Sequence, residues 1–359
     1  MGNTSKIVIS GYYGFDNIGD EAVLQSMLVT LRAYIPEVKI TVLSNNPQKT
    51  RSLYQVEAIN RWHIREVAKA LKESDMLISG GGSLLQDVTS GKTIPYYLGI
   101  VKIAQWYNKK VVFYSQGIGP VNKGYNRWLI KHIVNKIDGI FVRDSHSRDV
   151  LKQIGVRKPI TISADPVLGI KPHRDVYKYI KDLFGKERAV GVYIRPWQNE
   201  ENLLNSLEKA LKYVLNEGYK VYLIPMYYIQ DREIAYKLKS RLGENAILVD
   251  SMLTLDEVTA YTACFDFIIG MRLHSLIMAA AAKVPMIGLS YDPKVTDFLK
   301  DIEIPYCIDV ENIGANELIH MLRSLIENQN TQREHLSAVY ERQAAKLALP
   351  AQYIKEQLL

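Results

Sequence analysis

Cysteine is scarce in this sequence, whose 359 residues include only Cys264 and Cys307. No Cys-x-x-Cys pair is present, so the cysteine spacings typical of zinc sites and thioredoxin-like redox motifs are excluded. Both cysteines lie in apolar stretches, TACFDF and IPYCID. We therefore predict two buried thiols, no bound metal and a reducing environment.

Long hydrophobic runs are also missing. A helix that spans a bilayer needs about 20 apolar residues, and the best stretch, LIMAAAAKVPMIGL, is interrupted by Lys283 and Pro285. The N-terminal MGNTSKIVIS has too short an apolar run for a signal peptide. Lys6 stands where N-myristoylation requires Ser or Thr. These absences predict a soluble, cytoplasmic protein.

Blocks of like charge are absent, although the chain is basic. It has 45 Lys and Arg against 38 Asp and Glu, which gives a net charge of +7. Because Lys and Arg are spread along the chain, no nucleic-acid-binding arm is predicted. The positive charge fits a protein that binds anionic small molecules or touches an anionic membrane face. A solvated basic surface with no partner explains it equally well.

A regular alternation of short β-branched runs and helical patterns fills most of the chain. This alternation is typical of βαβ units and a parallel sheet. In the first half, the predicted strands are KIVIS (6–10), KITVLS (39–44), DMLIS (75–79), KVVFYS (110–115), GIFVR (139–143) and ITIS (160–163). In the second half, they are AVGVYI (189–194), KVYLIP (220–225), AILVD (246–250), FDFIIG (265–270) and VPMIGL (284–289).

The alternation pauses in a stretch near 165–187 that is richer in Pro and charge. We therefore predict two Rossmann-like, doubly wound α/β domains, over residues 1–165 and 188–330. A linker over 166–187 is expected to join them, and further helices to follow over 331–359. Ligands of open α/β sheets bind at the carboxyl ends of the strands, so two such domains predict a cleft between facing strand ends.

Three glycine-containing loops follow predicted strands of the first domain: GYYGFDNIGDEA (11–22), SGGGSLLQD (79–87) and SQGIGP (115–120). Glycine lets a ligand approach the backbone closely, and a helix N-terminus favours anions. The spacing fits neither a dinucleotide-binding motif nor a P-loop. Asp16 and Asn17 are interpreted as functional loop residues, whereas Asp20 either binds a ligand or caps the helix. The glycine run at 80–82 is either a ligand-binding loop or a structural turn.

Cations stand at the ends of several predicted strands. Arg143 in FVRDSHS and Arg195 in VYIRPW are expected to point into the cleft, while Arg148 is expected to lie on a helix surface. Lys294 in SYDPKVTDF lies near a predicted helix start, where it either binds an anion or is solvated.

The stretch GMRLHS (270–275) places Arg272 and His274 between a predicted buried strand and an Ala-rich helix. We predict that this helix begins near Leu273, which puts both side chains at its N-terminus. A positive helix end together with Arg favours a carboxylate or phosphate. His274 is a candidate proton donor; the alternative is a His that caps the turn. Alanine at either position is expected to leave stability unchanged.

In this order, the motifs GYYGFDNIGDEA, GGGSLLQD, SQGIGP, FVRDSHS and GMRLHS resemble the polysaccharide pyruvyl transferases, most closely the bacterial CsaB type. The resemblance extends from near residue 7 to near residue 295. It implies a glycosyltransferase-B-like fold and transfer of the carboxyvinyl unit of phosphoenolpyruvate to a sugar as a 4,6-linked pyruvate ketal, with release of phosphate. For the CsaB type, the acceptor is an N-acetylmannosamine in a lipid-diphosphate-linked precursor of a secondary cell-wall polymer. The ketal then serves S-layer anchoring.

For this reaction we predict His274 as the general acid and Asp16 as the base. The residues expected to bind phosphoenolpyruvate are Arg143, Arg195, Arg272, Leu273 and Lys294. Those expected to bind the acceptor are Tyr13, Asn17, Gly81, Gly82 and Gln116. The scheme needs no metal or organic cofactor and no nucleic acid. Because the acceptor is lipid-linked, peripheral contact with the inner membrane face is expected.

Other functions stay open at this point. A sugar-nucleotide-dependent glycosyltransferase of the same fold is the main alternative, because a fold does not fix chemistry. Where such enzymes carry an acidic ribose-binding motif, this sequence has SYDPKVTDF. The same difference disfavours a nucleotide-sugar epimerase. A non-catalytic sugar-phosphate-binding protein would leave Arg272 and His274 without a purpose.

Overall fold

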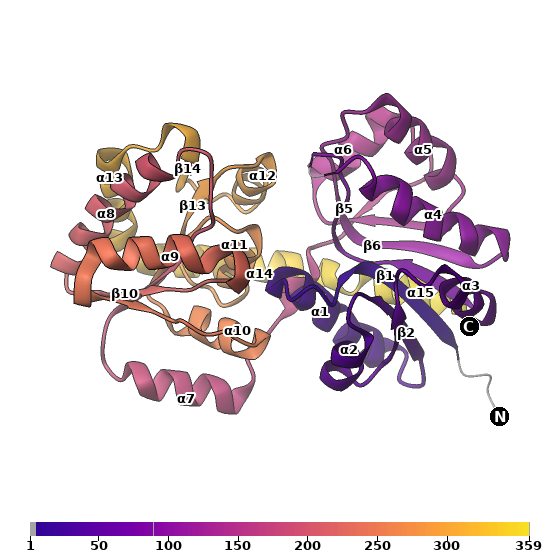
Figure 1. Cartoon of the computed structure of the whole chain (residues 1–359), viewed down its shortest axis with the longest axis horizontal. Coiled ribbons are helices and arrows are strands. Elements are labelled where there is room, and N and C mark those ends of the chain that lie inside the picture. Colours follow the sequence, from indigo (N-terminus) through magenta and orange to yellow (C-terminus); the bar gives the residue numbers. More distant parts are fainter. Residues whose placement is uncertain (1–4, 89, 359) are drawn as a thin grey trace. The chain divides into compact units, whose positions relative to one another are not determined.

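The computed structural model describes residues 5–88 and 90–358, and the chain divides into two compact units (Figure 1). The first unit combines Met1–Pro166 with Gln343–Leu359, and the second is Val167–Arg342. Each unit is built on a sheet of parallel strands flanked by helices. The predicted α/β class with two doubly wound domains is confirmed.

The first unit contains an eight-stranded sheet in the order β3-β2-β1-β4-β6-β7-β8, with β5 paired to β6. Its strands are β1 (Lys6–Tyr13), β2 (Lys39–Ser44), β3 (Glu57–Asn60), β4 (Met76–Ser79), β5 (Gly82–Leu85), β6 (Lys110–Ile118), β7 (Gly139–Val142) and β8 (Thr161–Ile162). Its helices are α1 (Ile18–Tyr34), α2 (Pro47–Tyr54), α3 (Ile64–Glu73), α4 (Thr93–Trp106), α5 (Gly124–Val134), α6 (Ser145–Ile154) and α15 (Leu349–Leu358).

Two hydrophobic layers cover the two faces of this sheet. Successive strand residues point to opposite faces, so in β1 Val8 joins one layer while Ile7, Ile9 and Tyr13 join the other. Helices α3 to α6 supply the first layer, and α1 and α15 supply the second. The helix α15 therefore completes the core of the first unit from the far end of the sequence.

The second unit contains a six-stranded sheet in the order β11-β10-β9-β12-β13-β14. Its strands are β9 (Ala189–Tyr193), β10 (Lys220–Leu223), β11 (Ala246–Leu248), β12 (Phe267–Gly270), β13 (Met286–Ser290) and β14 (Cys307–Asp309). Its helices are α7 (Arg174–Phe184), α8 (Glu200–Asn216), α9 (Tyr228–Leu242), α10 (Leu255–Cys264), α11 (Leu273–Ala281), α12 (Pro293–Asp301) and α13 (Ala315–Glu327). Helix α14 (Gln329–Leu347) runs across the boundary into the final segment.

The domain boundaries differ from those expected from the sequence. The stretch 166–187 is not a free linker, because it contains α7, which packs on α10. Phe184 of α7 is 5% exposed and lies against the rings of Tyr222 and Phe265. Likewise, the helices after residue 330 do not form a separate body, since they divide between the two units.

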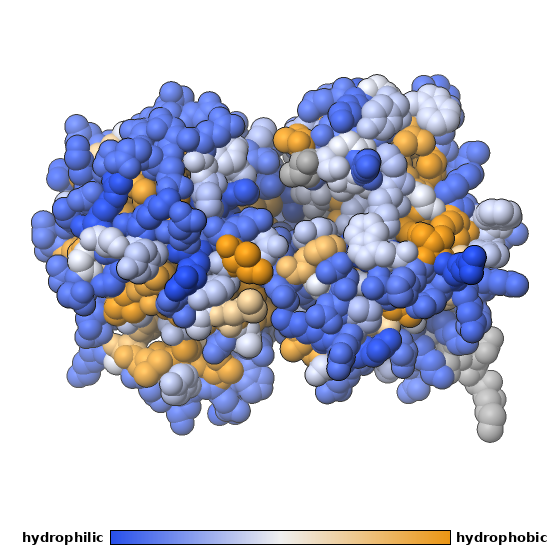
Figure 2. All heavy atoms as spheres, viewed as in Figure 1, coloured by the Kyte–Doolittle hydropathy of each residue, from blue (hydrophilic) through white to orange (hydrophobic). Residues whose placement is uncertain are grey.

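Hydrophilic side chains cover most of the visible face, with hydrophobic residues in scattered patches (Figure 2). Within the described ranges, no helix combines the length and apolar character needed to cross a bilayer. Cys264 and Cys307 are only partly buried, unlike the full burial expected. Burial still raises the pKa of the Cys264 thiol to about 11.

Candidate active site

The sequence motifs lie at the point in each sheet where the strand order reverses. In the first sheet, β2 and β3 are added on one side of β1, and the strands from β4 onward are added on the other side. In the second sheet, the order reverses in the same way between β9 and β12. Open α/β sheets bind ligands beyond the carboxyl strand ends at this point. The loops starting at Gly14 and Gly80 follow β1 and β4, and Arg195 and Arg272 follow β9 and β12. Each unit therefore has a candidate ligand edge.

Arg272 is held by a buried carboxylate. Its Nε and Nη2 donate to Asp231 at 2.7 and 2.5 Å, and Asp231 is fully buried. Asp231 also accepts from the backbone N–H of Tyr227 at 2.8 Å. This two-point contact fixes the guanidinium in one plane. The pattern around Arg272 predicted its place but not Asp231, which lies 41 residues earlier.

His274 lies in the first turn of α11, which begins at Leu273 as predicted. Arg272 is the N-cap, and its carbonyl oxygen accepts from the Ser275 backbone N–H and hydroxyl at 3.0 and 2.6 Å. His274 is partly buried, and its Nε2 atom is enclosed by protein. Leu273 is 5% exposed, and its side chain belongs to the core. Any contact from Leu273 to substrate is therefore through its backbone, and its predicted role stays a prediction.

Arg195 and Lys294 share one aromatic ring. The Arg195 guanidinium lies 4.8 Å from the ring centroid of Tyr291, and the Lys294 ammonium lies 5.5 Å from it. Trp197 packs against Tyr291 with 5.0 Å between ring centroids. Lys294 pairs with Asp292 at 3.3 Å, whereas no carboxylate among the described residues pairs with Arg195. The two cations and one acid leave a net positive charge beside β9 and β13.

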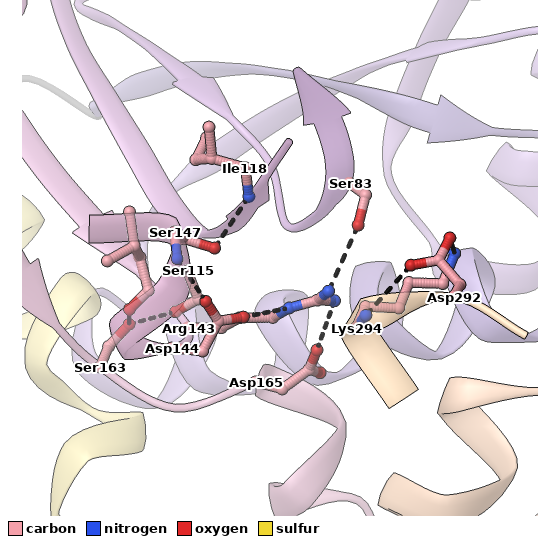
Figure 3. Close-up of polar contacts among 11 residues, drawn as sticks. Ser83, Ser115, Ile118, Arg143, Asp144, Ser147, Ser163, Asp165, Asp292 and Lys294 are labelled. Atoms are coloured by element: carbon pink, nitrogen blue, oxygen red, sulfur yellow. Dashed lines mark hydrogen bonds and ion pairs between the residues drawn. The ribbon is translucent and has the colours of Figure 1, made fainter. Parts of the chain in front are cut away.

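Arg143 does not project as an unpaired cation from the end of β7. Its side chain is 7% exposed, and Nε and Nη1 contact Asp144 and Asp165 at 3.1 and 3.3 Å (Figure 3). Nη2 donates to the Ser83 hydroxyl at 3.3 Å. Burial alone would raise the pKa of Asp144, but the Arg143 charge and hydrogen bonds outweigh it and hold that pKa below its usual value. A Cβ on Gly117 would overlap the guanidinium, which explains the glycine.

The loop between β1 and α1 is held together by its own polar groups. Asn17, rather than Asp20, is the N-cap of α1, and its side chain accepts from the Gly19 N–H at 3.1 Å. Asp16 has a positive φ of 60°, a conformation that Asp tolerates better than most residues, and pairs with Lys49 at 2.6 Å. The predicted role of Asp16 as a base stays a prediction.

Glu21 braces the same loop from the first turn of α1. It accepts from the Gly14 N–H at 2.8 Å and from the Tyr54 hydroxyl at 2.6 Å. Burial raises the pKa of Glu21, and these two hydrogen bonds only partly offset that effect. The loop conformation therefore depends on a half-buried carboxyl group.

Tyr13 is a core residue and not an acceptor contact. It is 0% exposed, and burial raises the pKa of its hydroxyl well above the usual value. A Cβ on Gly11 would overlap its ring, and a Cβ on Gly80 would overlap its hydroxyl. Gly11 and Gly80 therefore make room for Tyr13 rather than for a ligand. Ile7, Ile9 and Tyr13 occupy alternate positions of β1, and this spacing is the sequence signal that Tyr13 faces the core.

The remaining predicted acceptor residues are also buried. Gln116 is 0% exposed, and its amide nitrogen donates to the Ser79 hydroxyl at 2.6 Å. Gly81 has no space for a Cβ beside Val23, and Gly82 has a positive φ of 86°. The Gln116 side chain, and the absence of a side chain at Gly81 and Gly82, determine the shape of the loop after β4. Any contact from the two glycines to a ligand is through the backbone.

Arg61 was not predicted from the sequence. It is 3% exposed, follows β3, and donates to the Gly11 carbonyl oxygen at 2.8 Å. Its guanidinium lies 4.5–5.3 Å from the ring centroids of Phe15, Trp62, Tyr96 and Tyr97. No carboxylate among the described residues pairs with it. Arg61 therefore contributes a buried positive charge beside the loop after β1. Its only sequence signal is proximity to aromatic residues.

The second unit thus brings Arg195, Arg272, His274 and Lys294 to the carboxyl ends of neighbouring strands, whereas Arg143 belongs to the first unit. Among the residues that the structure describes, no three His, Cys, Asp or Glu side chains are grouped as metal ligands would be.

Comparison with solved structures shows the fold. HepE of Anabaena, solved with UDP and glucose, matches with a TM-score of 0.66 at 14% identity over 99% of each chain. The UDP-GlcNAc 2-epimerase of Neisseria meningitidis matches with a TM-score of 0.65 at 12% identity, over 98% of this chain and 99% of that one. The E. coli ADP-heptose heptosyltransferase II gives 0.55 at 16%, over 91% and 100%. These likenesses confirm the glycosyltransferase-B-like fold.

Sequence comparison adds the family. The amylovoran biosynthesis protein AmsJ of Erwinia amylovora is 18% identical, over 94% of this chain and 96% of that protein. The family model "Polysaccharide pyruvyl transferase" matches residues 17–293, most of the chain. The match begins at Asn17, the N-cap of α1, includes the ends of β9 and β12, and ends at Pro293. The chain belongs to the polysaccharide pyruvyl transferase family.

Proposed function

We propose that this transferase moves the carboxyvinyl unit of phosphoenolpyruvate onto a sugar as a pyruvate ketal and releases phosphate. The observation that supports this donor is the set of three cations at neighbouring strand ends, Arg195, Arg272 and Lys294. Phosphoenolpyruvate carries a carboxylate and a phosphate, and Arg binds both through paired N–H groups. The N-termini of α11 and α12 add partial positive charge.

His274 is the proton donor in this proposal. Its proton goes to C3 of the enol, which becomes a methyl group and leaves C2 electrophilic. One sugar hydroxyl attacks C2, the C2–O bond to phosphate breaks, and a second hydroxyl attacks C2 to close the ketal. Of the two hydroxyl protons, one replaces that given by His274 and one leaves on phosphate. Asp231 keeps Arg272 oriented toward the departing anion.

The acceptor is proposed on weaker support, the resemblance of the sequence motifs to the CsaB type. We take it to be N-acetylmannosamine in a lipid-diphosphate-linked polymer precursor, modified at its 4- and 6-hydroxyls. Asp16 is proposed as the base that receives one of the two hydroxyl protons and passes it to the departing phosphate. Its pairing with Lys49 requires that the substrate displace the lysine from that carboxylate.

The donor is tested by melting the purified chain with phosphoenolpyruvate and, separately, with UDP-glucose. Phosphoenolpyruvate is expected to raise the melting temperature because only the folded second unit gathers the three cations. Stabilisation by UDP-glucose alone would instead support a sugar-nucleotide glycosyltransferase.

The acid is tested by phosphate release with a sugar acceptor. His274→Gln is expected to lower turnover by about 10²–10⁴, the usual contribution of a positioned acid. It should remove one limb of the pH profile while donor binding stays within a few-fold. His320→Gln, on the exposed side of α13, is the matched control. Turnover of His274→Gln within a few-fold of His320→Gln would assign His274 to capping the turn.

A further inference from the structure

The 50 residues from 88 to 137 contain eight Lys and Arg residues and no Asp or Glu. Their charge of +8 exceeds the +7 of the whole chain, so the rest of the protein is close to neutral. No run of Lys and Arg marks this stretch; the absence of acids sets it apart. Its cations are Lys92, Lys102, Lys109, Lys110, Lys123, Arg127, Lys131 and Lys136.

The stretch forms α4, β6 and α5 of the first unit. Helices α4 and α5 pack against each other and lie side by side over the same face of the sheet (Figure 1). None of the eight cations forms an ion pair with a carboxylate in the part of the chain that the structure describes. Two of them instead contact carbonyl oxygens, Lys110 that of Gln357 and Arg127 that of Val121. The positive charge is therefore not paired with carboxylates, although Lys123 is among the groups that lower the pKa of Asp87.

Three large aromatic side chains project from the same two helices. Trp106 is 82% exposed, Trp128 57% and Tyr125 51%. Side chains of this size are normally buried, and exposure leaves their apolar area in water. Trp and Tyr are enriched at membrane–water interfaces, where the ring meets the acyl boundary and the polar atom stays hydrated. We call these three aromatics and the eight cations the basic face.

A groove of about 590 Å³ lies beside Trp106. Its charged lining is four lysines and one acid, Lys102, Lys109, Lys110, Lys136 and Asp138. The Asp138 carboxylate accepts from the Val111 N–H at 2.8 Å and so is already engaged. The groove offers several ammonium groups to one phosphate-sized anion.

We propose that the basic face docks the first unit on a bilayer surface that contains anionic phospholipid. Charge alone would suit any polyanion, but exposed indole rings among unpaired lysines favour a surface with an apolar layer beneath a negative one. The inference does not depend on the identity of the donor, since docking needs no turnover. It places the unit predicted to hold the acceptor next to lipid-linked molecules.

Co-sedimentation of the full chain with lipid vesicles tests the proposal. At low salt, the chain should bind phosphatidylcholine vesicles that contain phosphatidylglycerol and not pure phosphatidylcholine vesicles. Each Lys near an anionic bilayer strengthens partition by about a factor of five. The triple variant Lys102→Gln/Lys109→Gln/Lys136→Gln should therefore bind at least about tenfold more weakly.

A matched control separates the face from the net charge. Lys171→Gln/Lys186→Gln/Lys209→Gln removes the same charge from exposed positions of the second unit. It should change vesicle binding by no more than about twofold. Equal loss in the two triples, or equal binding to neutral vesicles, would overturn the proposal. Unchanged melting temperatures show that both variants fold.

The aromatic side chains distinguish a bilayer from a soluble polyanion. Trp106→Ser/Trp128→Ser should weaken vesicle binding, including the fraction that survives high salt, where charge is screened. It should leave binding to a DNA duplex unchanged. If the wild type binds DNA as tightly as vesicles and the aromatic variant binds vesicles normally, the face is a general polyanion site and the bilayer proposal fails.

Discussion

Arg272→Ala should destabilise the second unit even in the absence of any substrate. The substitution leaves the Asp231 carboxylate, which is 0% exposed, with only the Tyr227 N–H as its partner. Removing one member of a buried ion pair costs about 3–5 kcal/mol, because the other charge stays buried without compensation. This reverses the expectation from the sequence, in which Arg272 had no part in the core.

The size of the stability loss depends on which charge remains buried without its partner. Asp231→Ala leaves an Arg272 side chain that is 13% exposed and can be partly hydrated. We therefore expect about 4 kcal/mol for Arg272→Ala and about 2 kcal/mol for Asp231→Ala. The double variant Arg272→Met/Asp231→Asn removes both charges and keeps an acceptor for the Tyr227 N–H. It should recover at least half of the loss.

Urea denaturation followed by tryptophan fluorescence measures these values. Trp197 is the only tryptophan of residues 167–342, so a background with Trp62, Trp106 and Trp128 replaced by Phe reports the second unit alone. Those three side chains are at least 56% exposed, so the background should fold normally. A loss below about 1 kcal/mol for Arg272→Ala would refute the reasoning, as would a double variant less stable than either single one.

Further predictions concern the loops and the donor cations. Gly80→Ala should destabilise the first unit by about 1–3 kcal/mol through overlap with the Tyr13 hydroxyl, and Tyr13→Phe should rescue it; no rescue would contradict the overlap. Because burial raises the pKa of Glu21, stability should fall as pH rises above 4.5, and Glu21→Gln should flatten that slope. Arg195→Gln should weaken phosphoenolpyruvate binding about tenfold to a hundredfold in calorimetry, with Arg188→Gln as the control.

The sequence predicted most of the fold because short β-branched runs in a parallel sheet are buried on both faces and stand out from the helices between them. It also predicted the helix start at Leu273. Strands β3 and β14 escaped because their sequences, EAIN and CID, contain one β-branched residue each and so lack the β-branched run that marks the other strands. The path of α15 escaped for another reason: its partners lie in α1 and β6, far away in the sequence.

The site residues were harder to interpret, because the sequence shows a charge without its partner. Arg143 stands at a strand end as expected, yet its second acid, Asp165, lies 22 residues further on. Tyr13 was misread for a different reason. Gly11 suggested that the strand had ended, whereas β1 continues through it and carries Tyr13 into the core. The local sequence pattern predicts that a residue lies at the edge of a sheet. Its ion pairs and its burial depend on residues that are far away in the sequence.

The return of the chain into the first unit bears on how the protein is made. Ala351 and Ile354 of α15 are 0% exposed in the layer under α1. During synthesis, the second unit is complete once residue 342 has left the ribosome, while the first, although begun earlier, still exposes that layer. Domains usually fold in the order of their N-termini. Here the unit that begins first is finished last. Until α15 is made, the sheet of the first unit exposes an apolar layer that a chaperone can bind.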